Sequence, residues 1–364
     1  MISESVKAVI ANSRFNIFIT VGFLALAVAI ILIIGYVENK RIDNGKSTNS
    51  IAIRSSKFIS DYYRHVKHFA KTNQWDEKEA QVLKDVEAIS RHLLLIGEYK
   101  VRFYLGKLIY ENSKNELHRL NALIDEMGWT SVMMGRKSAV KYFLQAIGDV
   151  DGMIKQVQGH LTLYYNETDD YSLTKLFMKA RAYRHLGSTP SLKSYEKIEY
   201  CKKGLAIVEY LESLPALPKE ISKDKILNMR TGLYFGIGAA NLLQFSNCKV
   251  KNLADPIGNL VQAYKFNLLA KENAVTFENK HRYIKCLLTE NEIYRGRMMI
   301  NDYKDSVKKK ALEDKVQGIM ELDELTFEEN LKTVERLMND SIYIDEAYET
   351  YLIEKIKHWG ESDA

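Results

Sequence analysis

Residues 176–187 read LFMKARAYRHLG, and residues 195–205 read YEKIEYCKKGL. The first stretch belongs to a predicted helix over 171–186. That helix ends where Gly187 and a Ser-Thr-Pro turn follow, because glycine favours helix ends and proline cannot continue a helix. The second stretch belongs to a predicted helix over 192–214. Two helices joined by so short a turn run antiparallel, so this part of the chain predicts an αα-hairpin.

Small residues in this hairpin stand where they would let two helices approach closely. The pattern resembles the tetratricopeptide repeat (TPR) at six positions, Ala180, Ala182, Tyr183, Leu186, Gly187 and Gly204. A second stretch, 234–240 with 260–264 as its partner helix, resembles the repeat less completely, since Asn241 stands where the repeat has Tyr. The closing Pro of the repeat is missing, and the spacing between pairs exceeds its usual period.

The resemblance implies a curved solenoid of stacked hairpins, whose first helices line a concave groove for peptides or partner helices. The partner-binding residues expected there are Lys179, Tyr183, Asn241 and Arg282. For Tyr183 the alternative is packing between helices. The charged and amide side chains are the stronger candidates, because burying them without partners would be costly.

Helices are also predicted for the remainder of the chain. Only 4 Pro occur in 364 residues, and so few breakers favour long helices over an all-β fold. Residues 140–165 are expected to form one or two helices. Further helix pairs are predicted at 222–245 with 255–272 and at 276–300 with 302–322, after a helical bundle or hairpin over 50–137.

Residues 15–37 read FNIFITVGFLALAVAIILIIGYV, without a charged side chain. About 20 apolar residues suffice to cross a bilayer as a helix. A cleaved signal peptide would have a shorter apolar core and a small-x-small cleavage site, which this run does not offer. The predicted fold class is therefore all-α: one N-terminal transmembrane helix followed by a helical bundle and stacked αα-hairpins of a TPR-like solenoid.

The flanks of the predicted span carry nearly equal numbers of Lys and Arg, so the positive-inside rule does not fix its orientation. A short basic tail before a first apolar span is the usual signal-anchor layout, which favours the soluble part on the outer side. We therefore expect a single-pass membrane protein, of the bacterial inner-membrane type, with a periplasmic soluble part.

Charge is unevenly distributed along the chain, whose formal net charge is +5. Residues 321–364 carry a net charge of −9, which leaves +14 for the remainder. Such a basic body could be attracted to anionic lipid headgroups, and the acidic end could dock a partner, although a solvated helix face explains either pattern.

The predicted organisation is a tail at 1–14, a membrane span at 15–37, a stalk at 38–49, a bundle at 50–137, TPR-like hairpins at 138–322 and an acidic helical segment at 323–364.

The sequence carries little that predicts chemistry. Cys201, Cys248 and Cys286 are odd in number and widely spaced, which favours buried small side chains over a disulfide framework. His65 and His68 lie one helical turn apart, but nothing in the sequence supplies further metal ligands. No zinc-protease, hydrolase, Walker or kinase motif occurs. We therefore predict no catalytic residues, no metal and no cofactor.

The function expected from this layout is a membrane-anchored scaffold or adaptor that binds protein partners. A single anchor before TPR-like hairpins resembles bacterial accessory proteins of secretion, conjugation and envelope assembly. Expected partners are proteins of a membrane complex and the lipid around residues 15–37, with homo-oligomers possible and no specific nucleic acid. The alternatives are a membrane-proximal sensor or nucleic-acid adaptor that uses the basic body, and an enzyme with an unrecognised site.

Overall fold

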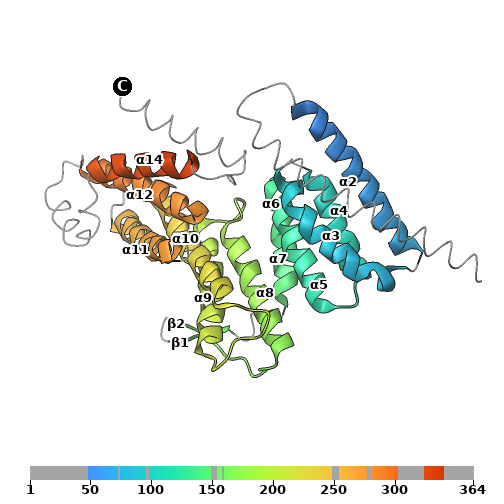
Figure 1. Ribbon diagram of the computed structural model, residues 1–364. Coiled ribbons are helices and arrows are strands. Elements are labelled where there is room, and N and C mark those ends of the chain that lie inside the picture. Colours follow the sequence, from blue (N-terminus) through green and yellow to red (C-terminus); the bar gives the residue numbers. More distant parts are fainter. Residues whose placement is uncertain are drawn as a thin grey trace, which may run out of the picture. The chain divides into compact units, whose positions relative to one another are not determined.

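The computed structural model describes residues 48–72, 74–95, 98–148, 154–157, 160–247, 254–276, 280–301 and 324–339 (Figure 1). The chain divides into two compact units, Met1–Asp61 and Tyr62–Ala364. The predicted membrane span at 15–37 lies outside the described residues, as does the acidic segment apart from 324–339. Within the described ranges, no helix is long and apolar enough to cross a membrane.

Helices make up nearly all of the described chain, which confirms the predicted α-helical character. Helix α2 (Thr48–Lys71) begins in the first unit and ends in the second. The second unit continues with α3 (Trp75–Leu95), α4 (Tyr99–Asn112), α5 (Glu116–Asn121), η1 (Ala122–Trp129), α6 (Thr130–Met133) and α7 (Ala139–Ile147). It goes on with α8 (Asp170–Gly187), α9 (Ser194–Ser213), α10 (Lys223–Asn247), α11 (Ala254–Thr276), α12 (Lys280–Asn301) and α14 (Glu324–Asn339).

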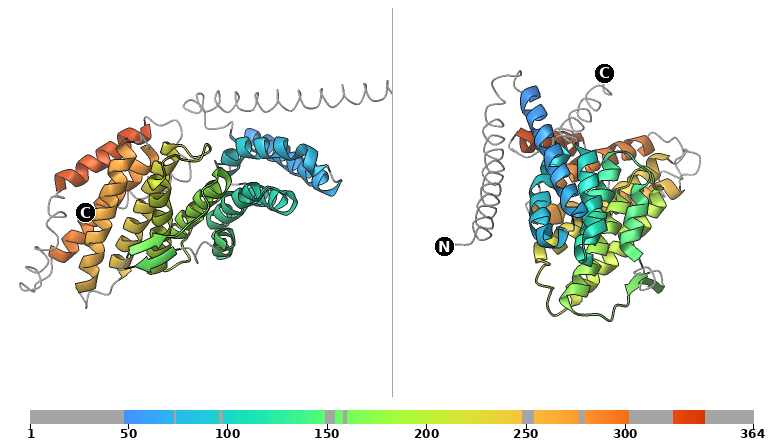
Figure 2. Two further views of the ribbon diagram at one scale, coloured as in Figure 1. Left: turned by 90° about the horizontal axis from the view of Figure 1, so that it is seen from below. Right: turned by 90° about the vertical axis from the view of Figure 1, so that its right-hand side faces the viewer.

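A β-hairpin interrupts the region for which the sequence predicted only helices, residues 140–165. Strands β1 (Ile154–Val157) and β2 (His160–Leu163) pair antiparallel, with Ile154 opposite Leu163 (Figure 2). Helix α7 ends before Gly148, whose φ of 54° favours glycine. Ile154 and Leu163 pack against the main core, so they share one face of the hairpin. The prediction of one or two helices over 140–165 therefore holds for α7 and was wrong for the hairpin.

One core joins the predicted bundle to the predicted hairpins. It runs from Phe103 on α4 through Phe143 on α7 and Tyr183 on α8 to Ile237 on α10. The predicted boundary between 137 and 138 thus falls inside a continuous hydrophobic cluster. Smaller clusters lie around Leu260 and Ala263 on α11, and where Val334 on α14 meets Ile284, Leu287 and Leu288 on α12.

Helix pairs stack closely where glycine faces a neighbouring helix. Helix α8 begins after Asp169, whose carboxylate accepts the Ser172 amide at 3.0 Å, and a Cβ at Gly187 would overlap Sγ of Cys201 on α9. On α10, a Cβ at Gly238 would lie 3.2 Å from the carbonyl oxygen of Ala263 on α11. Helix α10 also contacts α8 and α12. The described chain therefore contains successive, closely packed helix pairs, as the sequence predicted.

The two cysteines that the structure describes are buried, as the sequence predicted. Cys201 and Cys286 are free and fully buried, and burial raises the pKa of each thiol to about 12. Both are therefore packing residues, protonated at neutral pH. Cys248 lies outside the described residues.

Candidate functional site

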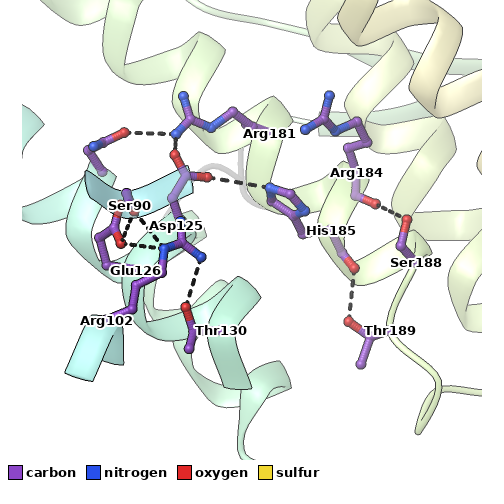
Figure 3. A network of polar contacts seen from close by, with 11 residues as sticks. Ser90, Arg102, Asp125, Glu126, Thr130, Arg181, Arg184, His185, Ser188 and Thr189 are labelled. Atoms are coloured by element: carbon purple, nitrogen blue, oxygen red, sulfur yellow. Dashed lines mark hydrogen bonds and ion pairs between the residues drawn. The ribbon is translucent and has the colours of Figure 1, made fainter. Parts of the chain in front are cut away.

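The candidate site begins at the π-helix η1, which joins α5 to α6. A π-helical segment redirects side chains relative to an α-helix and occurs frequently at functional sites. Here the consecutive residues Asp125 and Glu126 enter two different polar clusters (Figure 3). Glu126 contacts Arg102 on α4, and Asp125 contacts Arg181 on α8.

The first cluster, which we call the paired network, consists of Ser90, Arg102, Glu126 and Thr130. Arg102 Nε lies 2.7 Å from Glu126 Oε2 and donates to Ser90 Oγ at 2.6 Å, while its Nη1 donates to Thr130 Oγ1 at 2.9 Å. Ser90 Oγ donates to Glu126 Oε2 at 2.7 Å. All four residues are buried. Each charge therefore has an opposite charge and a hydroxyl partner, as buried ions require.

Burial and pairing act against each other on these two charges. Burial raises the pKa of the Glu126 carboxyl, and Arg102 partly offsets that shift. Burial likewise lowers the pKa of the Arg102 guanidinium, with Glu126 opposing the shift. The approach of α4 to η1 depends on Gly106, because a Cβ there would overlap Cβ of Glu126. The glycine thus keeps the two charged side chains within contact distance.

The second cluster lies between η1 and α8. Asp125 pairs with Nη2 of Arg181, which also donates to Asn121 Oδ1 at 2.7 Å. Nε2 of His185 lies 3.5 Å from Asp125 Oδ1. The imidazole is buried between Trp129, at 4.8 Å between ring centroids, and Phe143, at 5.5 Å with an interplanar angle of 18°. Two aromatic rings therefore fix the orientation of His185.

His185 is neutral at physiological pH. Burial lowers the pKa of His185 well below its usual value, and the positive charges of Arg184, Arg181, Arg102 and Arg282 lower it further. Its contact with Asp125 is accordingly a polar contact of a neutral ring rather than an ion pair. The carboxylate of Asp125 therefore forms its ion pair with Arg181.

A pocket of about 410 Å³ opens beside this cluster, within the size range of small-molecule sites. We call it the arginine pocket. Its charged side chains come from η1, α8, the loop before α10 and α10 itself: Asp125, Arg181, Arg184, Glu220 and Lys225. Its apolar side chains come from α8, that loop and α10: Phe177, Met178, Ile221 and Met229. The pocket therefore combines a group of cations with an apolar wall.

Arg184 is the unusual member of the pocket. Its backbone carbonyl accepts the Ser188 hydroxyl at 3.3 Å, but its guanidinium pairs with no carboxylate among the described residues (Figure 3). Burial lowers the pKa of Arg184 to about 10, and the nearby charge of Arg282 acts in the same direction. Both arginines reach Gly232 on α10, where a Cβ would lie 2.7 Å from Arg184 Cδ and 3.5 Å from Arg282 Nη2. Arg184 is thus a half-buried cation beside a second cation.

The four residues predicted from the sequence to bind a partner do not form one cluster. Tyr183 is fully buried, 6.1 Å from Tyr200 between ring centroids, so it packs between helices. Asn241 is buried and donates to its own helix at Ile237 O, at 2.8 Å. Lys179 on α8 and Arg282 on α12 are half-buried, and the Arg282 guanidinium lies 5.1 Å from the Phe235 ring centroid. A partner surface that includes these residues stays a prediction.

Sequence reasoning missed Arg181 and Arg184, although both lie in the quoted stretch 176–187. Their spacing of three residues places them on one face of a helix, which was the signal present. The spacing gave no reason to expect that η1 and α10 would cover that face.

The described part of the chain contains no group of three His, Cys, Asp or Glu side chains that could hold a metal ion.

Comparison of the chain with known protein families, with curated proteins and with solved structures found no match. The fold and the pocket therefore carry the functional argument.

Proposed function

We propose that the protein is a membrane-anchored scaffold or adaptor whose TPR-like helix pairs bind protein partners. The supporting observation is the repeated stacking of α8 with α9 and of α10 with α11, in which α10 also contacts α8 and α12. Stacks of this kind present their first helices as an extended surface. The resemblance to the repeat is consistent with the burial of Ala180, Ala182, Tyr183 and Leu186.

The membrane anchor in this proposal rests on the uncharged sequence 15–37. Alkaline carbonate washing of membranes that contain the full chain is expected to leave it in the pellet. Release into the supernatant would remove the anchor from the proposal while leaving partner binding open.

Partner binding is tested by purifying the full chain in mild detergent and identifying the chains that co-purify with it. The variant Lys179→Ala with Arg282→Ala removes the two half-buried cations of the predicted surface. It should reduce recovery of a specific partner while leaving the circular dichroism spectrum unchanged. The matched control is Lys202→Ala with Lys203→Ala on α9, which removes equal charge from the second helix of a pair. Equal recovery with both variants would show that the first helices do not form the partner surface.

A further inference from the structure

We propose that the arginine pocket binds a phosphate group, carried either by inorganic phosphate or by a small organic phosphate ester. This site needs no partner protein, although Arg282 of the proposed partner surface lies beside Arg184. The arguments are the unbalanced charge of Arg184, the donors left open on Arg181, and the combination of cations with an apolar wall.

The first argument is the charge of Arg184. A charged group that is partly withdrawn from water costs free energy unless an opposite charge or hydrogen-bond acceptors compensate it. Within the described chain the Arg184 guanidinium has no carboxylate partner, and Arg282 adds a second positive charge nearby. In the paired network, by contrast, Arg102 has the carboxylate of Glu126 and two hydroxyl acceptors as partners. This protein therefore does place an acid beside a buried arginine where the arginine has a structural role. At Arg184 an anion from solution would supply the missing compensation.

The second argument is the set of donors that face the same pocket. Arg181 uses Nη2 for Asp125 and Asn121 and its Nε is fully buried, so its Nη1 is the group left to face a ligand. Arg181 and Arg184, which are three residues apart on α8, both line this pocket (Figure 3). Lys225 donates to the carbonyl oxygen of Glu220 at 2.8 Å, which leaves two of its three ammonium protons. Guanidinium groups present paired donors that match phosphate oxygens.

The acids of the pocket do not cancel this charge. Asp125 is already paired with Arg181, and His185 is neutral. Glu220 is an exposed side chain at the edge of the pocket, so water screens it more strongly than the half-buried arginines. Several cations around one space favour a phosphate dianion over a singly charged carboxylate. The apolar wall formed by Phe177, Ile221 and Met229 gives room for the organic part of an ester.

The test is isothermal titration of the full chain, in mild detergent and at constant ionic strength, with inorganic phosphate, adenosine monophosphate and acetate. Phosphate or the monophosphate should bind, and acetate should bind much more weakly. Arg184→Gln should weaken phosphate binding about tenfold or more, because a charge-assisted hydrogen bond is lost. The control Arg119→Gln makes the same change of net charge at an exposed arginine outside the pocket. Circular dichroism confirms that both variants fold.

The outcomes separate clearly. Tighter binding of adenosine monophosphate than of inorganic phosphate would assign the pocket to an organic ester, and equal binding would assign it to phosphate itself; both support the proposal. It is overturned if neither compound binds at millimolar concentration, if acetate binds as tightly, or if Arg119→Gln weakens binding as much as Arg184→Gln. None of these results depends on whether a partner protein is found.

Discussion

The paired network and the arginine pocket both include a residue of the π-helix η1, yet their arginines differ in charge pairing. In the paired network, Arg102 contacts Glu126, Ser90 and Thr130, all of them buried. In the arginine pocket, Arg184 is half-buried and has no carboxylate partner in the described chain. A complete set of partners is typical of a structural role, whereas an incomplete set leaves room for a ligand.

The largest effect is expected from breaking the paired network. Glu126→Gln keeps the shape of the side chain but leaves Arg102 buried without a negative charge. We expect the free energy of unfolding to fall by about 3–5 kcal/mol, the usual result when one partner of a buried pair is removed. Denaturant unfolding of the full chain in mild detergent, followed by circular dichroism, measures this loss.

The matched control for that experiment is Glu111→Gln, also in a pair with a cation. Glu111 lies 3.5 Å from Lys107 on α4, and both side chains are about half exposed. Removing this exposed pair should change the free energy of unfolding by less than about 0.5 kcal/mol. Similar losses for Glu111→Gln and Glu126→Gln would contradict the distinction between buried and exposed pairs.

A smaller loss is expected from moving α4 away from η1. In Gly106→Ala the new methyl group would overlap Cβ of Glu126 and spread the two helices. Overpacking of this kind costs about 1–3 kcal/mol. The control is Gly258→Ala on α11, where no atom lies within 4 Å of the new Cβ; helix propensity alone should then raise stability. If Gly106→Ala unfolds at the same denaturant concentration as wild type, the close approach is not needed.

The next effect depends on pH and concerns His185. Because its pKa is lowered in the folded chain, the unfolded chain binds a proton that the folded chain does not, once the pH falls below about 6.5. Stability should therefore decrease as pH falls, by up to about 1.4 kcal/mol per pH unit. His185→Phe keeps an aromatic ring between Trp129 and Phe143 but removes this titration.

The measurement compares the free energy of unfolding of wild type and His185→Phe at pH 7 and pH 5.5. Glu126 contributes with the opposite sign, since its raised pKa lets the folded chain take up a proton first, but it does so in both proteins. The difference between the two proteins therefore isolates His185. Its charged surroundings are Asp125 on η1, Arg102 on α4, Arg181 and Arg184 on α8, and Arg282 on α12. Equal pH dependence in both proteins would mean that the pKa of His185 is not lowered in the folded chain.

Much of the helical architecture could be predicted from the sequence. The predicted ranges 171–186 and 192–214 correspond to α8 (Asp170–Gly187) and α9 (Ser194–Ser213). This prediction succeeded because apolar periodicity and a Gly-to-Pro turn can both be read from neighbouring residues. The hairpin of β1 and β2 was missed because its strands have only four residues each. Over so few residues, the alternation of apolar and polar side chains in a strand cannot be distinguished from the pattern of a helix. The π-helix was missed because its extra residue follows from packing, and no residue type signals it.

The candidate site was harder to predict for a related reason. Arg181 and Arg184 look like ordinary solvated residues of a helix rich in Lys and Arg. Their burial depends on η1 and on the loop before α10, which are distant in sequence. The prediction instead selected Lys179, Tyr183, Asn241 and Arg282, of which Tyr183 and Asn241 are buried. Local patterns thus locate helices, but the charge balance at a helix face depends on tertiary contacts.

The most direct test of the difference between the two arginines is the thermal unfolding of wild type and Arg184→Gln, with and without phosphate at constant ionic strength. Without phosphate, removing an uncompensated charge should make the variant more stable, by about 1 kcal/mol. With phosphate at a hundred times its Kd, ligand binding should stabilise wild type by about 2.7 kcal/mol and the variant by less, so that the order reverses. A variant that is less stable than wild type without phosphate, or equal stabilisation of both proteins by phosphate, would contradict the assignment of Arg184 to an anion site.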